Sequence, residues 1–269
     1  MERVSGKSSS MIESMKKILA RVKSNAPWRR RHSSSIAYPR DLDVEVVDTL
    51  EKVHNHTQTS TERLAALCEA VKYVVTSKIP GDIVECGVWR GGSMMAVAHT
   101  LQKLEHCSRD LYLFDTFSGM TEPGELDVAL DGTLASDVLS HERKKDPAFA
   151  WCAAGLAEVR TNMASTDYPS KNIHYVAGKV EDTLPAAAPE QISLLRLDTD
   201  WYESTRHELD HLFPRLASGG VLIIDDYGHW QGARRAVDEY LEDHGIPMLL
   251  NRVDYTARIG VYHPRNEAA

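Results

Sequence analysis

Acidic side chains stand at two places in the C-terminal half of the chain, each directly after an apolar run. Asp198 and Asp200 follow "ISLLRL", and Asp225 and Asp226 follow "GVLII". Carboxylates grouped without a nearby cysteine favour a hard divalent cation, with Mg²⁺ ahead of Ca²⁺ or Mn²⁺. Without a cation, three such groups would raise one another's pKa values. We therefore expect Asp198, Asp225 and Asp226 to bind a metal. The alternative is that one or two of them only cap turns.

A second metal motif lies between these two places. "HELDH" sets His207 and His211 four residues apart with Glu208 between them, which is the H-E-x-x-H pattern of zinc proteases. On a helical wheel, Leu209 and Leu212 lie on an apolar stripe, and the two histidines lie near the opposite side. The third histidine of metzincins is also missing from the expected place. We interpret the motif as a coincidence on a solvated helix face and keep a zinc peptidase as a rival hypothesis.

A glycine-bearing loop, "CGVWRGGS", follows an earlier apolar run. Gly87, Gly91 and Gly92 allow a ligand to approach the backbone, and Ser93 can cap the next helix, whose N–H groups then suit a carboxylate. The loop has neither G-x-G-x-x-G nor G-K-[ST] spacing, which weakens a dinucleotide or P-loop interpretation. Asp115, after the next apolar run, can accept both hydroxyls of a ribose. Together these features describe S-adenosyl-L-methionine better than NAD. For the loop alone, a tight structural turn is the alternative.

Strand and helix patterns alternate along the chain from Pro39 onward. The strands are expected at 82–86, 111–115, 172–178, 192–198, 220–226 and 258–263, and the helices at 60–77, 93–104, 202–216 and 232–244. This alternation predicts an α/β fold with a mostly parallel, doubly wound sheet and helices on both faces. Ligands bind such sheets beyond the carboxyl ends of the strands. The acidic and glycine residues expected at those ends are Glu85, Asp115, Gly178, Asp198, Asp225 and Asp226.

Length and charge set limits on the class of protein. The chain has 269 residues, 42% of them hydrophobic, and a net charge of −8. It can bury a substantial core, and the negative charge argues against a nucleic-acid groove. No apolar run is long enough for a membrane span, no signal peptide opens the chain, and the four cysteines show no paired spacing. We expect a cytoplasmic protein that binds no nucleic acid and has no membrane span.

Three regions are distinguished within the chain. Residues 1–38 are basic and partly helical in pattern, so we expect an N-terminal arm outside the main domain. Residues 39–269 form the domain, in which the segment at about 118–150 is long enough to be a lid or a substrate wall. The arm and the exposed sheet edge make us expect a homo-oligomer.

Several of these motifs, in this order, resemble the macrocin O-methyltransferase family. They are "IVECGVWRGGS", "LFDTFSGM", "GKVEDTLP", "LLRLDTDWYEST" and "GGVLIIDDYGHWQGARRAVDEY", and the resemblance extends over about residues 58–262. The lead-in "HNHTQTSTERL" departs from the family pattern. The resemblance implies a Rossmann-like class I methyltransferase fold. It also implies a magnesium-dependent enzyme that uses S-adenosyl-L-methionine to methylate sugar hydroxyls of antibiotics and related glycosides.

The resemblance also implies roles for individual residues. Asp198, Asp225 and Asp226 are expected to bind the metal, and Asp200 to act as general base. The implied cofactor contacts are Glu85, Gly87, Ser93, Asp115, Phe117, Gly178 and Val180.

Further residues complete the predicted site. His141, in the segment 118–150, is a second candidate base, although a lone loop histidine often faces solvent. Tyr227, His229 and Trp230 follow the metal pair and could line the pocket for a small-molecule glycoside; structural packing is the alternative for each. Two other functions stay open beside the zinc peptidase. One is methylation of a non-sugar vicinal diol or catechol-like acceptor, and the other is a non-catalytic cofactor-binding protein.

Overall fold

The structure is a computed structural model and describes residues 38–143 and 152–264. The arm predicted over residues 1–38, except for Tyr38, lies outside the described residues, as does the end of the segment 118–150. The described helices and strands belong to the unit that begins at Pro39. Among the described helices, none combines the length and apolar character that a membrane crossing requires.

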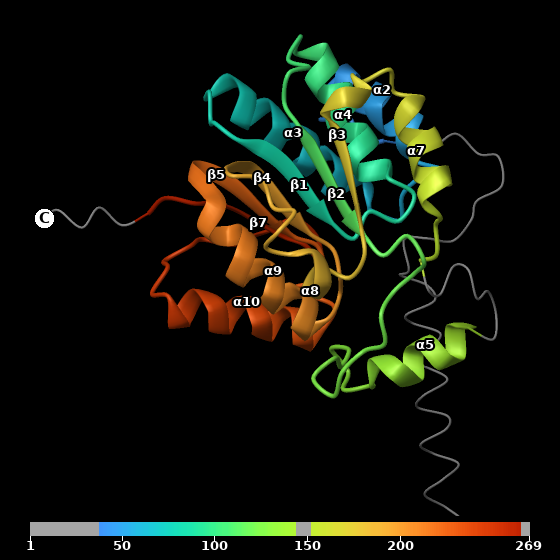
Figure 1. Ribbon diagram of the computed structural model, residues 1–269, viewed down its shortest axis with the longest axis vertical. Coiled ribbons are helices and arrows are strands. Elements are labelled where there is room, and N and C mark those ends of the chain that lie inside the picture. The colour runs from blue at the N-terminus through green and yellow to red at the C-terminus, as the bar shows by residue number, and fades with distance from the viewer. Residues whose placement is uncertain (1–37, 144–151, 265–269) are drawn as a thin grey trace, which may run out of the picture. The chain divides into compact units, whose positions relative to one another are not determined.

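Within the described residues, seven strands form one sheet in the order β3-β2-β1-β4-β5-β7-β6 (Figure 1). Neighbouring strands from β3 to β5 run parallel, and β7 runs antiparallel to β5 and to β6. The strands are β1 (Asp82–Cys86), β2 (Leu111–Asp115), β3 (Ile173–Ala177), β4 (Ile192–Leu197), β5 (Leu216–Ile224), β6 (Asn251–Arg252) and β7 (Arg258–Val261). The predicted mostly parallel α/β sheet is therefore confirmed.

Helices cover both faces of this sheet (Figure 1). On one face α2, α3, α4 and α7 pack on one another, and on the other face α8, α9 and α10 do the same. The helices are α2 (Val44–Val53), α3 (Thr61–Thr76), α4 (Gly92–Lys103), α5 (Ala135–Arg143), α7 (Leu156–Ala164), α8 (Val180–Thr183), α9 (Tyr202–Leu212) and α10 (Gln231–Asp243). Ser60 caps α3 as its sequence predicts, because its Oγ accepts a hydrogen bond from the amide of Arg63 at 3.2 Å.

The sequence pattern located most elements but not all of their ends. β1 and β2 match the predicted ranges, whereas β5 begins at Leu216 rather than at residue 220. The strand continues through Gly219, which has a φ of +82°, and its register against β4 shifts. Among the described helices and strands, α2, α5, α7, the short α8 and the short β6 were not predicted.

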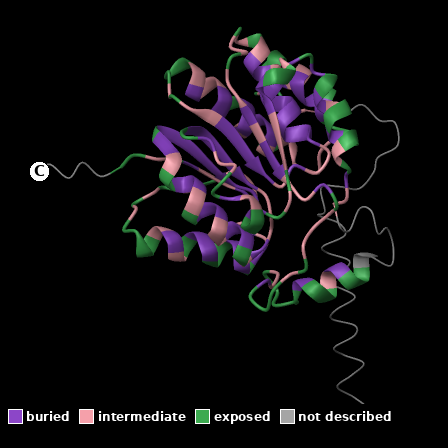
Figure 2. Ribbon diagram, viewed as in Figure 1, coloured by how far each residue is buried: buried purple, intermediate pink, exposed green. Residues whose placement is uncertain are grey.

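Coverage on both faces buries the central strands almost completely. Every residue of β4 is buried, and Figure 2 shows the middle of the sheet as a buried layer between the helices. Leu195 of β4 and Leu222 of β5 belong to one apolar cluster with Leu209 of α9 and Val237 of α10. In such an interior a charged side chain is stable only with charged or hydrogen-bonding partners. Arg196, the last residue but one of β4, is the charged residue whose partners must therefore be found.

The carboxyl ends of the central strands meet closely. The amide of Asp198 donates to the carbonyl of Cys86, and the amide of Asp225 donates to the carbonyl of Leu197, both at 2.9 Å. Gly87 follows β1 with a φ of +81°, and a Cβ at this position would lie 2.0 Å from the carbonyl oxygen of Asp198. Only glycine lets these two strand ends come this near.

We expect Gly87→Ala to lower the free energy of unfolding by roughly 3 kcal/mol or more, because backbone strain and a main-chain clash add together. Gly132→Ala is the matched control. Gly132 has a similar φ of +85°, but nothing lies within 4 Å of its added Cβ. That variant should lose only about 1–2 kcal/mol, the strain alone. Urea unfolding of both proteins measures the difference, and equal losses would contradict the close approach at Gly87.

Candidate active site

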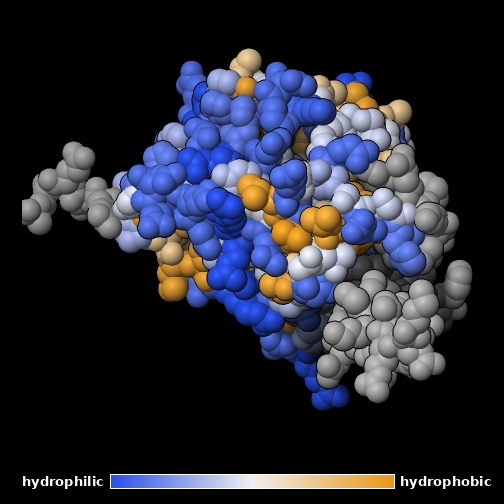
Figure 3. Space-filling model, turned by 90° about the horizontal axis from the view of Figure 1, so that it is seen from below, coloured by the Kyte–Doolittle hydropathy of each residue, from blue (hydrophilic) through white to orange (hydrophobic). Residues whose placement is uncertain are grey.

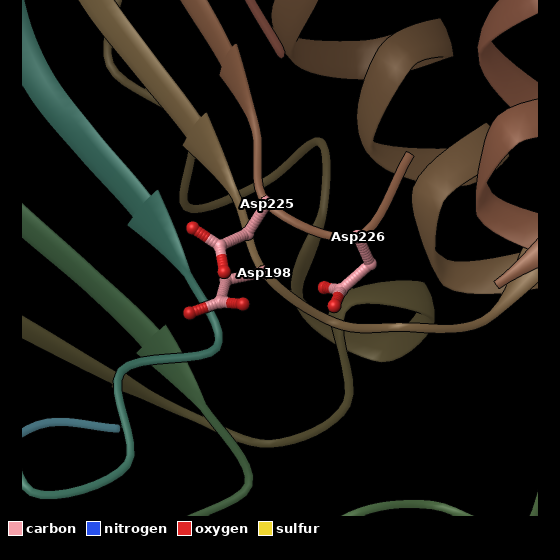
Figure 4. A group of neighbouring side chains, drawn as sticks. All are labelled: Asp198, Asp225 and Asp226. Carbon is pink, nitrogen blue, oxygen red and sulfur yellow. The ribbon is translucent and has the colours of Figure 1, made fainter. Parts of the chain in front are cut away.

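The three aspartates predicted to bind a metal lie together at the ends of β4 and β5. Each offers a carboxylate oxygen within 4.8 Å of those of the other two. Figure 4 shows the carboxylates of Asp198 and Asp225 next to each other and that of Asp226 across from them. Within the described parts of the chain, no other histidine, cysteine or carboxylate group of three or more converges in this way.

A buried arginine that the sequence analysis did not assign holds two of these acids. The guanidinium of Arg196 donates to Glu85, to Asp198 at 2.7 Å and to Asp225 at 2.5 Å, and its side chain is only 3% exposed. It also donates to the hydroxyl of Thr59 at 3.2 Å. Arg196 thus joins the ends of β1, β4 and β5 through their carboxylates.

A second arginine reaches the same cluster from α3. Arg63 donates to the Oδ2 of Asp225, and its Nε lies 3.1 Å from the Oδ2 of Asp254, in the loop between β6 and β7. Burial alone would raise the pKa of Asp225, but Arg196 and Arg63 outweigh it and lower this pKa below its ordinary value. Asp225 is therefore ionised in the folded chain.

At the other two aspartates the arginines do not outweigh burial, although Arg196 also pairs with Asp198. Burial raises the pKa of Asp198 and of Asp226 well above the ordinary value, with the neighbouring acids adding to the shift. The Oδ2 of Asp226 is buried and has no hydrogen-bond partner. An unpartnered buried carboxylate oxygen beside two further carboxylates suits a hard divalent cation. Asp198, Asp225 and Asp226 therefore fit the metal that the sequence predicted.

Asp200 stands at the same end of the sheet in a strained conformation. Its φ is +69°, and its Oδ1 accepts a hydrogen bond from the indole Nε1 of Trp230 at 2.9 Å. Burial, and after it the charge of Asp198, raises the pKa of Asp200 to about 8. A non-glycine residue held in the left-handed region is typical of functional sites.

Most residues predicted to contact the cofactor surround the ends of β1, β2 and β3. Gly91, with a φ of +84°, is the N-cap of α4, and Ser93 is buried in the first turn of that helix. The amide of Gly178, after β3, donates to the carbonyl of Asp115 at 3.0 Å, and Val180 begins α8. Gly87, directly after β1, lies beside Asp198.

Asp115 fixes the glycine loop to the end of β2. Its Oδ2 accepts from the amides of Val88 and Trp89 at 2.8 and 3.0 Å, and its Oδ1 accepts from the amide of Phe117 at 2.7 Å. These bonds hold the loop that follows β1 against the turn that follows β2. A contact between Asp115 and a ribose stays a prediction.

Glu85 lies deeper than a residue that only contacts a cofactor. It is 1% exposed and pairs with Arg196, while its Oε2 has no hydrogen-bond partner. Burial raises its pKa to about 7 although Arg196 opposes the shift. The structure therefore places Glu85 in the same charged cluster as the predicted metal ligands.

The lead-in to α3, which departs from the family pattern, lies over this end of the sheet. The carbonyl of His56 accepts from the amide of Gly92 at 3.0 Å, and a Cβ on Gly92 would lie 2.4 Å from that oxygen. Thr59 contacts Arg196, and Ser60 donates to Asp254 at 2.9 Å. No motif in the sequence had pointed to these contacts.

The residues predicted to line the acceptor pocket lie in different places. Trp230 is 5% exposed and bonds to Asp200, and the ring of His229 lies against Trp230 at 4.6 Å between centroids. The hydroxyl of Tyr227 instead donates to Asp238, on the exposed surface of α10, at 2.6 Å. His141 is exposed on α5. The structure thus brings Trp230 and His229 to the cluster but neither Tyr227 nor His141.

Part of the segment 118–150 is tied to the starts of α9 and α10. Asp127, which is 1% exposed, accepts from the amide of Tyr202 at 2.8 Å and from that of Gly124 at 2.7 Å. The indole of Trp201 donates to the carbonyl of Thr121, and Ala129 forms a bridge with Trp230. The described part of this segment is therefore anchored beside the two tryptophans, and Asp127, which carries much of the anchoring, was not predicted.

The H-E-x-x-H motif behaves only partly as expected. The rings of His207 and His211 pack edge to face 4.4 Å apart, and the structure brings no third metal ligand to them among the described residues. Glu208, however, is fully buried, so the prediction of a solvated face was wrong for this residue. On the helix it lies at the flank of the apolar stripe formed by Leu209 and Leu212, and packing extends to it.

Comparison with known proteins assigns the family. The profile of the macrocin-O-methyltransferase (TylF) family matches residues 7–264. The chain belongs to this family. The predicted class I methyltransferase fold is confirmed by a solved structure, the O-methyltransferase NovP, which aligns with a TM-score of 0.69 and 28% identity over 96% of this chain and 100% of that one.

Two characterised relatives share about a third of the sequence. Demethyldecarbamoylnovobiocin O-methyltransferase from Streptomyces niveus is 34% identical over 210 residues, which are 78% of this chain and 76% of the relative. The 8-demethyl-8-(2,3-dimethoxy-alpha-L-rhamnosyl)-tetracenomycin-C 4'-O-methyltransferase from Streptomyces olivaceus is 35% identical over 201 residues, which are 75% and 73% of the two chains. This chain is accordingly an O-methyltransferase.

The raised pKa of Asp200 predicts how the stability of the cation-free protein depends on pH. The folded chain keeps a proton up to about pH 8, whereas an unfolded chain releases it near about pH 4. Stability from this group is therefore present at low pH and is lost as pH rises through this window.

We expect Asp200→Asn, which cannot titrate, to flatten the fall in Tm of EDTA-treated protein between roughly pH 5 and pH 8. Asp137→Asn, at an exposed position on α5, is the control and should keep the wild-type slope. Differential scanning fluorimetry across this range measures the three proteins. Parallel curves for wild type and Asp200→Asn would contradict the raised pKa.

Proposed function

We propose that this O-methyltransferase transfers the methyl group of S-adenosyl-L-methionine to a hydroxyl of a sugar in a glycosylated natural product, with a divalent cation, Mg²⁺ first, in its site. The printed names of the relatives support this acceptor class, because they refer to novobiocin and to a rhamnosyl group of tetracenomycin C. The observation that carries the metal is the convergence of Asp198, Asp225 and Asp226.

These three aspartates would hold the cation. When bound, it would supply Lewis-acid stabilisation of the oxygen that becomes the nucleophile, since a free sugar hydroxyl is a poor nucleophile at neutral pH. The chain's own part is to keep the ligands in place. Arg196 fixes Asp198 and Asp225, while the partnerless Oδ2 of Asp226 supplies an oxygen that nothing else occupies.

Asp200 is the residue we assign as general base. The indole N–H of Trp230 holds one of its oxygens, so the orientation of the carboxyl is fixed. Without a nearby cation its pKa of about 8 keeps it protonated at neutral pH. Any positive charge brought beside it lowers this pKa and makes the carboxylate available to accept the hydroxyl proton.

The methyl donor belongs at the ends of β1, β2 and β3. The loop from Gly87 to Gly91 is fixed by Asp115, and the start of α4 offers backbone N–H groups to the carboxylate of the donor. Holding donor and acceptor on adjacent strand ends favours an in-line approach of the hydroxyl to the methyl group. A cytoplasmic setting and a homo-oligomer stay predictions from the sequence.

A direct test incubates the full chain with methyl-labelled S-adenosyl-L-methionine and a panel of deoxysugar glycosides, with Mg²⁺ or with EDTA. Transfer of label to a sugar hydroxyl only in the presence of Mg²⁺ is the expected result. Label on the aglycone would contradict the acceptor class. Equal transfer in EDTA would contradict the metal.

Asp226→Asn is the variant that removes a metal ligand with the least structural damage, because the Oδ2 of Asp226 has no protein partner. We expect turnover to fall by roughly a hundredfold or more, since the metal's Lewis-acid contribution is worth several kcal/mol. The affinity for S-adenosylmethionine should stay within about twofold, because the donor lies at other strand ends. Calorimetry and the labelling assay measure the two quantities. Normal Mg²⁺-dependent turnover would remove Asp226 from the metal site.

Asp200→Asn tests the general base separately. It should lower turnover by roughly a hundredfold or more while Mn²⁺ and S-adenosylmethionine still bind, since general-base catalysis contributes about 10²–10⁴-fold. Single-turnover kinetics at saturating donor and metal measure the chemical step. A normal rate would assign the proton to another residue.

A further inference from the structure

Asp225 differs from the two other predicted ligands because each of its carboxylate oxygens accepts a hydrogen bond from an arginine. Its Oδ1 accepts from Arg196, and its Oδ2 accepts from Arg63. Asp198 meets a guanidinium at its Oδ2, and the Oδ2 of Asp226 meets no partner. A divalent cation that binds all three acids must therefore share an oxygen of Asp225 with an arginine or displace one.

The two arginines are not equally free to move. Arg196 projects from the buried strand β4, one residue before its end, and pairs with Glu85 and Asp198 as well as Asp225. Its departure would leave Glu85 and Asp198 without the arginine that pairs with them, which is costly. Arg63 lies near the start of α3 and already has a second acid, Asp254, within 3.1 Å of its Nε.

The carboxylate of Asp254 is held in place by hydrogen bonds that do not depend on Arg63. Its Oδ1 accepts from the amides of Thr256 and Ala257, both at 2.9 Å, and its Oδ2 accepts from the hydroxyl of Ser60 at 2.9 Å. These bonds fix the carboxylate in the loop between β6 and β7. A shift of the Arg63 guanidinium from Asp225 to Asp254 therefore needs no new arrangement of the acid.

We propose that Arg63 competes with the divalent cation for Asp225 and withdraws onto Asp254 when the cation binds. This inference rests on the metal site of the proposed function. In the cation-free chain Arg63 adds a second positive charge beside Asp225, after that of Arg196. The same charge repels an arriving cation, and Arg63 thereby sets how tightly the site holds its metal.

This exchange would link the metal to the acceptor side of the site. Thr256 donates through its Oγ1 to the carbonyl of Asp225 at 2.5 Å, and Tyr255 packs its ring 6.0 Å from that of His229. Both residues belong to the loop that carries Asp254. A tighter Arg63–Asp254 pair therefore fixes the loop beside His229 when the cation is present.

The test measures Mn²⁺ binding to full-length, EDTA-treated protein without methyl donor, by the loss of the free Mn²⁺ signal in electron paramagnetic resonance. Arg63→Gln should bind Mn²⁺ roughly tenfold more tightly than wild type, because a competing positive charge is gone. Asp254→Asn should bind it more weakly, because Arg63 then has only Asp225. A weaker affinity for Arg63→Gln would overturn the inference, since Arg63 would then be holding Asp225 in place for the metal.

The double variant separates competition from a simple change of charge. If Asp254 acts through Arg63, then Asp254→Asn should have little further effect in the Arg63→Gln protein. An undiminished effect there would contradict the exchange. Should Arg63→Gln not fold, Arg63→Lys carries the test together with Asp254→Asn, because lysine keeps the competing charge and should retain near wild-type affinity. An affinity for Arg63→Lys that rises well above wild type would contradict the competition.

Arg206→Gln is the control for loss of an ion-paired arginine away from the acidic cluster. Arg206 pairs with Asp210 and Asp243 on the outer side of α9 and should leave the Mn²⁺ affinity unchanged. A wild-type protein that binds no Mn²⁺ would instead remove the metal from the proposed function. Wild-type binding with unchanged affinity in both Arg63→Gln and Asp254→Asn would overturn the Arg63 inference alone.

Discussion

Carboxylates that lie close together with little access to water need a positive charge beside them. In this chain a buried arginine supplies the first such charge. Arg196 projects from the all-buried strand β4 and binds Glu85, near the end of β1, and the acids that follow β4 and β5. Breaking a buried ion pair of this kind typically costs about 3–5 kcal/mol, because the remaining charge has no partner. The position of Arg196 therefore constrains where Glu85, Asp198 and Asp225 can stand, and with them the ends of the central strands.

The sheet makes this arrangement possible because its order interleaves the chain. β1 lies between β2 and β4, and β4 lies between β1 and β5, so strand ends that are far apart in sequence become neighbours. Arg63 and Asp225 are 162 residues apart and still share a hydrogen bond. Asp198 follows β4, which neighbours β1, and Asp225 and Asp226 follow β5, one strand further on. The predicted metal ligands and the glycine loop after β1 therefore lie at the same edge of the sheet.

The sequence was sufficient for features that depend on local pattern. Apolar runs with an acid or a glycine directly after them located the strands, and Asp198, Asp225 and Asp226 could be grouped because parallel strands end at the same edge. It was insufficient where a role depends on a distant partner. The pattern "LLRLD" does not indicate that its arginine pairs with acids from other strands. An arginine in an apolar strand has the same local pattern whether its guanidinium reaches the surface or is buried.

The same limit applies to Trp230 and Asp127. A tryptophan directly after two predicted metal ligands suggests a ring that packs on the acceptor sugar. The structure shows in addition that the indole N–H of Trp230 donates to Asp200. Asp127 lies in a glycine-bearing stretch with the pattern of a loop. Its structural role depends on a hydrogen bond from an amide at the start of α9, 75 residues further along the chain. Periodicity carries no information about such bonds, because they are fixed only when the helices have packed.

The shared guanidinium has a consequence for how the two halves of the site depend on each other. Glu85 is the last residue but one of the strand that leads into the glycine loop, and Asp198 and Asp225 belong to the predicted metal site, but all three pair with Arg196. The end of β1 beside the glycine loop is thereby tied through one side chain to the acids that follow β4 and β5. A change of charge at either place would act on the other through Arg196.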